Sequence, residues 1–142
     1  MKFQKALIIN IGEESLSKDI WKSLNSSIAK KVFLPRDSAK ILPELKDADC
    51  LLVSFGLEVT KKMMDAAPKL KYIGILATAY GKIDVAYAKK KNIVISNLAG
   101  YSTESVAEFV IATILESIRG LEGGGKETRT SKQLFRNGNI YV

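Results

Sequence analysis

The sequence predicts an α/β protein with a doubly wound, five-stranded parallel sheet in the order 2-1-3-4-5. Short, branched apolar runs alternate along the chain with segments whose apolar residues recur at helical spacing. Parallel strands need right-handed crossovers, and these segments have the length of crossover helices. With 46% hydrophobic residues, a chain of 142 residues can form one compact core. The expected architecture is therefore flavodoxin-like, with helices on both faces of the sheet.

Five apolar runs are predicted to be the strands of this sheet. The first ends at Gly12 and the second at Pro35, two residues that stop a strand. The predicted strands are residues 6–11, 31–34, 50–54, 72–76 and 93–95.

Helices are predicted between the strands and after the last one. Ser15 can cap the first helix, and Pro68 ends the helix predicted over 59–67. The remaining predicted helices are residues 39–45, 84–91 and 103–121. The apolar stripe of the last helix is so wide that it needs partners on two sides. We expect a flavodoxin-like domain over 1–100, an interdomain type of helix over 101–122, and a polar, basic tail or linker over 123–142.

The residue types that the chain lacks exclude much of enzyme chemistry. The sequence contains no His and a single Cys, Cys50, within an apolar run. Without His the chain has no Ser-His or Cys-His nucleophile pair, no His-based acid-base catalysis and no His-containing zinc site. We therefore expect no catalytic and no metal-binding residues, and we interpret Cys50 as a small core residue.

Charge and hydropathy indicate a soluble cytoplasmic protein that binds neither nucleic acid nor membrane. The 22 Lys and Arg outnumber the 15 Asp and Glu, but they are spread over separate helix ends and loops without interleaved aromatic residues. No charged leader precedes a long apolar run, and no stretch of about 18 apolar residues could cross a bilayer.

The phosphate-binding motifs of doubly wound sheets are absent from the predicted strand ends. The turn after the first strand contains Glu13 and Glu14, which disfavours a flavin phosphate, and the third strand ends at Ser54 without the Asp of a phospho-accepting receiver domain. Residues 120–126 nearly match a P-loop, but Glu127 replaces the magnesium-binding Ser or Thr and the run follows a helix. No Gly-x-Gly-x-x-Gly joins a strand to a helix, so no dinucleotide site is predicted.

The most specific signal lies between Lys69 and Glu108. It consists of LKYIGILATAYGKID at 70–84, NIVISN at 92–97 and GYSTESVAE at 100–108. Together these blocks closely resemble the D-2-hydroxyacid dehydrogenase family, and the resemblance covers roughly residues 5 to 122. Members of the subgroup that looks nearest act on glycerate, hydroxypyruvate, glyoxylate or related small acids.

The resemblance implies a substrate site made largely of backbone groups. Family members bind the substrate carboxylate partly on N–H groups of the loop after the fourth strand, which corresponds here to Thr78, Ala79, Tyr80 and Gly81. Consecutive amides at a strand end form a concave donor site for an anion. The family commonly has Gly where this chain has Ala79, and Asn or Asp where it has Gly81. Phe55 matches a position that shapes the pocket for the substrate side chain, and a core or lid aromatic fits it equally well.

The resemblance also implies a nicotinamide cofactor held outside this chain. In the family an NAD-binding Rossmann domain interrupts the substrate domain and contains the catalytic Arg, Glu and His. Ser102, Thr103 and Val106 match a segment that approaches the nicotinamide, and helix capping and core packing explain the same residues equally well. We therefore expect no cofactor on this chain alone and NAD in a full-length parent.

The resulting hypothesis is the substrate-binding half of an NAD-dependent D-2-hydroxyacid dehydrogenase, inactive without its Rossmann domain. The parent would transfer a hydride between NAD(H) and a small 2-hydroxy or 2-keto acid, which this half binds weakly. The alternative is a stand-alone flavodoxin-like module for protein association. We also expect a homodimer through helix 103–121, either helix against helix or swapped about a hinge at Ala99 and Gly100, because Ile111 and Leu115 would otherwise face water.

Overall fold

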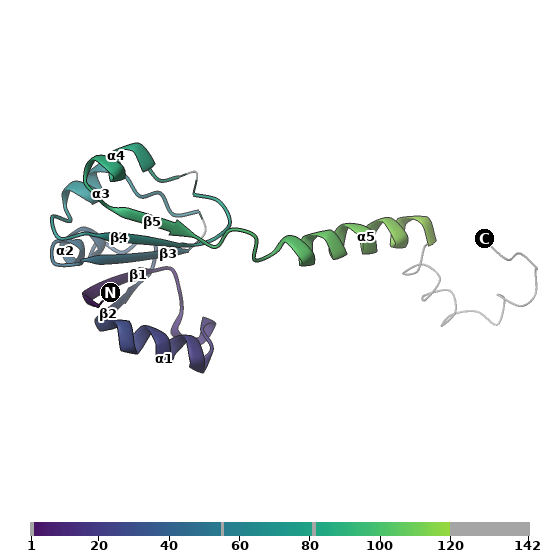
Figure 1. The fold of residues 1–142 in the computed structure, drawn as a ribbon, viewed down its shortest axis with the longest axis horizontal. Helices are drawn as coiled ribbons and strands as arrows, with labels where there is room; N and C mark the ends of the chain where they lie inside the picture. The colour runs from purple at the N-terminus through teal and green to yellow at the C-terminus, as the bar shows by residue number, and fades with distance from the viewer. Residues whose placement is uncertain (1, 55, 81, 120–142) are drawn as a thin grey trace, which may run out of the picture. The chain divides into compact units, whose positions relative to one another are not determined.

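The structure, a computed structural model, describes residues 2–54, 56–80 and 82–119. The chain divides into two units, the first ending at Gly100 and the second beginning at Tyr101. The first unit contains the sheet, and the described part of the second contains one long helix, α5 (Figure 1).

The first unit is a five-stranded sheet in the order β2-β1-β3-β4-β5, and every neighbouring pair is parallel, which confirms the predicted fold class. The strands are β1 (Phe3–Ile9), β2 (Ile28–Leu34), β3 (Cys50–Ser54), β4 (Tyr72–Leu76) and β5 (Val94–Asn97). The observed bounds of β3 and β4 match the prediction. The strands β1 and β2 begin three residues earlier than predicted, and β5 continues to Asn97.

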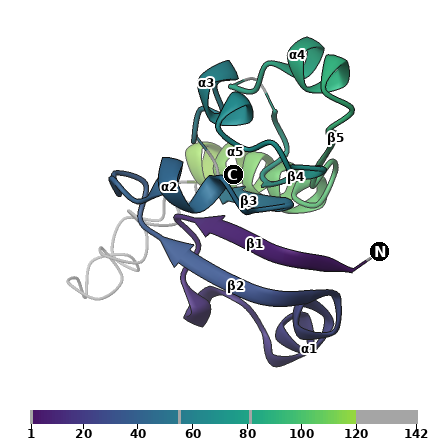
Figure 2. The same ribbon diagram turned by 90° about the vertical axis from the view of Figure 1, so that its left-hand side faces the viewer.

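Helices lie on both faces of the sheet (Figure 2). One face carries α1, which lies over β1 and β2, and the other carries the remaining helices of the first unit. These helices are α1 (Lys18–Ser27), α2 (Ile41–Leu45), α3 (Lys61–Asp65) and α4 (Val85–Lys90).

The strand period of two divides the core between these faces. In β1, Leu7 and Ile9 belong to the larger apolar cluster, which also contains Met64 of α3, whereas Ala6 and Ile8 belong to a smaller cluster on the side of α1. All four β1 side chains are at most 1% exposed. Cys50 belongs to the smaller cluster and is buried, which confirms its interpretation as a core residue.

The connection from β1 to α1 differs from the prediction at both of its ends. The strand ends at Ile9 because Asn10 adopts a left-handed backbone conformation, with φ +57°. The helix is capped by Ser17 and not by Ser15, since the Ser17 hydroxyl accepts a hydrogen bond from the amide of Ile20. Ser15 instead closes a short 3₁₀ turn over Glu13–Ser15.

The helices on the other face are shorter than predicted. Val59, which the sequence predicts to be helical, pairs with Ile83 as an isolated parallel bridge, so α3 begins after its cap, Thr60. Asp84 lies outside α4 as its N-cap and accepts a hydrogen bond from the amide of Tyr87 at 2.8 Å. Side-chain caps and loop pairing thus remove residues from both predicted helices.

The long helix α5 (Thr103–Arg119) forms where the apolar stripe predicts it, and its 17 residues include no buried side chain. Phe109 and Ile118 are each 72% exposed. Residues 120 and 121 of the predicted helix, and the predicted tail over 123–142, lie outside the described residues.

Candidate functional site

The carboxyl edge of the sheet brings together the loops that follow β3 and β4. The amide of Val59 donates to the carbonyl of Lys82 at 3.1 Å, and Val59 and Ile83 form the isolated bridge. Val59 is 1% exposed and Ile83 is 8% exposed, so the bridge is a buried contact between two otherwise polar loops. Binding residues in this fold lie at the carboxyl ends of the strands, which makes this edge the first place to look for a site.

The loop after β4 is held by hydrogen bonds that its carbonyl groups accept. Its carbonyls point into the protein: that of Ala77 accepts from the amide of Leu98, and that of Thr78 accepts from Nδ2 of Asn97 at 2.6 Å. Within the described residues, none accepts a hydrogen bond from the amides of Thr78, Ala79 or Tyr80. Thr78, Ala79 and Tyr80 are themselves exposed residues, and consecutive amides at a strand end are groups that can donate to an anion.

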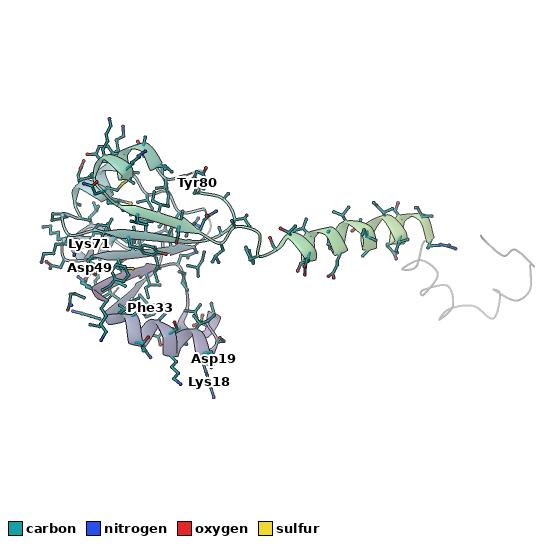
Figure 3. The ribbon with its side chains drawn as sticks, viewed as in Figure 1. Lys18, Asp19, Phe33, Asp49, Lys71 and Tyr80 are labelled. Carbon is teal, nitrogen blue, oxygen red and sulfur yellow. The ribbon has the colours of Figure 1, made fainter. Side chains whose placement is uncertain are left out.

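A cavity of about 180 Å³ adjoins these amides. It has an apolar floor and one cationic residue, a combination that suits a small acid with a short carbon chain. Its lining residues are Gly56, Leu57, Ile75, Ala79, Tyr80, Lys82 and Ile83. Figure 3 shows Tyr80 on the carboxyl side of the sheet, whereas Asp49 and Lys71, which precede β3 and β4, lie on the amino side.

A second polar contact lies where β1 and β3 end side by side. Nδ2 of Asn10 donates to Oγ of Ser54 at 2.9 Å. The chain reverses its direction of strand addition between β1 and β3, which is the point where ligands bind in such sheets. Asn10 is not among the predicted site residues, although an Asn directly after an apolar strand is a signal for a left-handed strand exit.

The structure does not place every predicted site residue at the carboxyl edge of the sheet. Phe55 and Gly81 lie outside the described residues. Ser102, Thr103 and Val106 belong to the second unit, where the carbonyl of Ser102 accepts from the amide of Val106 at 2.9 Å and opens α5. Val106 is 57% exposed, so within the described residues core packing does not account for it.

The carboxylate of Asp84, which is the nearest to the site, has a structural role. Asp84 caps α4, and this backbone hydrogen bond from Tyr87, together with Lys61 at 3.4 Å, holds the pKa of Asp84 below its usual range. An acid that is ionised well below neutral pH does not donate a proton at neutral pH. Among the described residues no group of three His, Cys, Asp or Glu could hold a metal ion.

A nucleotide phosphate does not fit the turn that follows β1. That turn contains Glu13 and Glu14, and the carboxylate of Glu14 occupies the space in which a Cβ on Gly12 would lie. A negative side chain in this position repels a phosphate, where a dinucleotide-binding turn would offer glycine and free amides.

The fold is that of a doubly wound α/β protein, with a small cavity beside the loop after its fourth strand. A sequence model described as the catalytic domain of D-isomer specific 2-hydroxyacid dehydrogenases matches residues 7–134. The chain therefore belongs to this family.

Individual relatives agree with this assignment. Glyoxylate reductase of Korarchaeum cryptofilum is 30% identical over 120 residues, which are 84% of this chain and 33% of that protein. Hydroxypyruvate reductase of Blautia hydrogenotrophica is 32% identical over 80 residues, or 56% of this chain and 24% of that protein. The chain thus spans a third or less of the length of these two relatives.

A solved structure supports the fold. D-lactate dehydrogenase from Aquifex aeolicus, in a complex with NAD and lactic acid, superposes with a TM-score of 0.70 at 24% identity. The match covers 96% of this chain and 39% of that chain. No helix in the described part of the chain is long and apolar enough to cross a membrane.

Proposed function

We propose that this chain is the substrate-binding part of an NAD-dependent D-2-hydroxyacid dehydrogenase and acts in the cytoplasm. The observation that supports this best is the row of three available amides at Thr78, Ala79 and Tyr80 beside a small cavity. Family membership and the names of the relatives, which include glyoxylate and hydroxypyruvate reductases, support a small 2-hydroxy or 2-keto acid as the ligand.

The role of this chain is to bind and orient the acid. The amides of residues 78–80 hold the carboxylate, and the buried bridge below them fixes the loop against its neighbour. In the whole protein, the nicotinamide of NAD(H), held by a domain outside these residues, would supply or accept the hydride. Residues 78–80 would determine which face of the substrate carbon is presented, and this chain alone is expected to be inactive.

Backbone donors can be tested by removing one N–H group. Glyoxylate and oxalate should shift the amide resonances of residues 77–80 with millimolar affinity, equivalent to about 4 kcal/mol. Ala79→Pro removes the central donor and should weaken binding about tenfold or more, since each hydrogen bond to a charged group is worth about 1.5 to 3 kcal/mol. Ala79→Gly keeps the N–H group and is the matched control.

Two outcomes would contradict the proposed site. Shifts confined to the lysines at 89–91 would mean nonspecific charge binding. Equal affinities of Ala79→Pro and Ala79→Gly would mean that the backbone of this loop does not hold the carboxylate.

A second proposal concerns partners, and it is favoured by the exposure of α5. We infer that two copies of this chain associate through α5, where Ile111 is 59% and Leu115 is 51% exposed. Burying one such side chain contributes roughly 1.5 to 3 kcal/mol, so several offset the entropic cost of association. Gly100, with φ +78°, provides a hinge at which the helices could be exchanged between copies.

The first unit offers an apolar surface for an exchanged helix. A cavity of about 260 Å³ lies on the α1 side of the sheet, with Leu16 and Leu24 on one side and Leu52 and Gly74 on the other. A helix from a second copy that docks in this cavity would also agree with the alternative function, that of a protein-association module.

A further inference from the structure

The end of β5 holds the loop that follows β4 at two successive carbonyl groups. The amide of Leu98 donates to the carbonyl of Ala77 at 3.0 Å, and Nδ2 of Asn97 donates to the carbonyl of Thr78 at 2.6 Å. Asn97 is the last residue of β5 and pairs with Ile75 in the register of β4 and β5. A side chain at the end of the neighbouring strand therefore fixes a peptide group of this loop.

The hydrogen bond from Asn97 also determines the direction of an amide. In a trans peptide the C=O and N–H groups lie in one plane and point in opposite directions. No peptide bond between described residues is cis. Because the carbonyl of Thr78 and the amide of Ala79 belong to one peptide group, the bond that draws the carbonyl toward Asn97 turns the Ala79 N–H away from it.

Ala79 and Asn97 line different cavities. Ala79 lines the cavity of about 180 Å³ together with Tyr80, whereas Asn97 lines the cavity of about 260 Å³ on the α1 side of the sheet. Asn97 is not among the described residues that line the smaller cavity. An effect of Asn97 on an acid in the smaller cavity must therefore pass through the peptide that joins Thr78 to Ala79.

The residue type at position 97 suits this role. The side-chain amide of Asn can donate a hydrogen bond to a carbonyl oxygen, whereas an ionised Asp can only accept one. Ser96, the preceding residue of β5, has a hydroxyl that bonds to the hydroxyl of Tyr72. Two neighbouring polar side chains of β5 thus have different partners, and the partner of Asn97 is the loop after β4.

We propose that Asn97 is a positioning residue for the acid. It holds the peptide between Thr78 and Ala79 so that the Ala79 N–H points at the bound carboxylate, and it does not touch the acid itself. This inference rests on the proposed function and adds a residue to its site. Loss of the side-chain donor frees the peptide, and the acid then has to order it on binding.

The test measures the affinity of the 142-residue chain for glyoxylate by the amide shifts of residues 77–80. Asn97→Ala should weaken binding about fivefold or more, because the native chain holds ready a peptide that the acid must order in the variant. Asn97→Asp is nearly equal in size and should weaken binding at least as much, since its carboxylate accepts the Ala79 N–H and repels the acid. Ser96→Ala removes another side-chain hydrogen bond of β5 and should leave the affinity unchanged.

A second set of variants separates positioning from a general loss of structure. Ala79→Pro has no N–H at position 79, so in that background Asn97→Ala should cause no further loss of affinity. In the background of Ala79→Gly, which keeps the N–H, Asn97→Ala should keep its full effect. Asn97→Gln places a donor on a longer side chain and should recover part of the affinity that Asn97→Ala loses.

Failure of this inference is distinguishable from failure of the proposed function. If glyoxylate shifts residues 77–80 and Asn97→Ala and Asn97→Asp both bind it as tightly as the native sequence, the positioning role is wrong and the carboxylate loop stands. Additive losses from Asn97→Ala and Ala79→Pro, or an equal loss in Ser96→Ala, would also overturn the role, because Asn97 would then act on the fold as a whole. If no acid shifts residues 77–80 of the native sequence, the proposed function itself is wrong.

Discussion

Single residues at the amino edge of the sheet show how one side chain can hold two segments together. Asp49 is 8% exposed, and its two carboxylate oxygens accept hydrogen bonds from the amides of Gln4 and Lys5 at 2.9 and 3.0 Å. Its own amide donates to the carbonyl of Lys5, and its carbonyl accepts from the amide of Lys71. Asp49 thus ties the start of β3 to both neighbouring strands.

Replacement of Asp49 should therefore destabilise the fold. Asp49→Ala removes both acceptors, and we expect the free energy of unfolding to fall by roughly 2 to 4 kcal/mol, given about 1.5 to 3 kcal/mol for each hydrogen bond to a charged group. Urea unfolding followed by circular dichroism measures this change. The matched control is Asp47→Ala, whose partner Lys69 is 64% exposed and whose loss should cost about 1 kcal/mol or less. Equal effects of the two substitutions would refute this role for Asp49.

Cys50, the neighbour of Asp49, should be chemically inert while the protein is folded. Burial raises the pKa of its thiol to about 12, and the charge of Asp49 adds to the effect. The thiolate is the reactive form, so at pH 8 a disulfide reagent should label Cys50 only in denaturant. Labelling of the native protein within minutes would show that this part of the core opens readily.

At the scale of elements, α3 and α4 are joined by a polar cluster around Asp65. Oδ1 of Asp65 accepts hydrogen bonds from Nζ of Lys91 at 2.6 Å and from the hydroxyl of Tyr87 at 2.7 Å. Nζ of Lys91 also donates to the carbonyl of Met64 at 3.0 Å. These bonds connect two short helices that have few turns of their own to stabilise them.

This cluster predicts an acid-dependent part of the stability. The hydrogen bond from Lys91, and next that from Tyr87, lowers the pKa of Asp65 in the folded state below its ordinary value of 3.8. The unfolded chain therefore binds the proton first as the pH falls. The stabilisation is complete above about pH 5 and is lost as the pH falls through the folded-state pKa.

The measurement is the free energy of unfolding of the native sequence and of Asp65→Asn between pH 6 and 2. The variant should lose stability at neutral pH and show the shallower decline with acid. Asp47→Asn, which alters a carboxylate on the protein surface, should keep the steep decline. A parallel decline in all three proteins would mean that Asp65 contributes nothing to the acid sensitivity.

The helix α5 makes a prediction about assembly. Ile111→Glu combined with Leu115→Glu should convert a dimer into a monomer in sedimentation experiments, because charged side chains cannot be buried in the interface without a partner. Glu108→Lys and Glu116→Lys alter charge on the same helix without removing apolar surface, and they should leave most of the dimer intact. An unaltered chain that is monomeric at high concentration would exclude self-association through α5.

At the scale of the whole molecule, the proposed function predicts that this chain binds a small acid without oxidising or reducing it. The chain has no His, and its β1 turn is acidic where a nucleotide phosphate would have to lie. We expect no oxidation of NADH by the purified chain with glyoxylate, hydroxypyruvate or pyruvate, measured by nicotinamide absorbance. Turnover that persists through rigorous purification and scales with the concentration of this chain would refute the proposal.

The sheet could be predicted from sequence because it depends on patterns spread over many residues. The apolar runs and the crossover lengths determine the strand order, and the bounds of β3 and β4 follow from runs with sharp ends. The errors lie where a single side chain decides the outcome. Ser15 was the predicted cap, whereas the 3₁₀ turn over Glu13–Ser15 delays the start of the helix and makes Ser17 the cap.

The site was harder to predict than the sheet. The loop at residues 78–80 could be found through the family resemblance. Residue types alone do not show which backbone amides are free to bind a ligand. Gly56 and Lys82 line one cavity from different loops, and their proximity depends on tertiary structure. The Val59–Ile83 bridge was hidden for the same reason, because Val59 has the spacing of a helical residue.

That bridge also constrains how the proposed acid site can be redesigned. Val59 and Ile83 belong to different loops, yet the pair is buried and the Val59 amide bonds to Lys82, so neither loop can change length or path alone. A loop transplanted singly from a relative would meet a partner shaped for another sequence. Redesign for a different acid therefore requires residues 56–60 and 78–84 to be exchanged together, as one cassette.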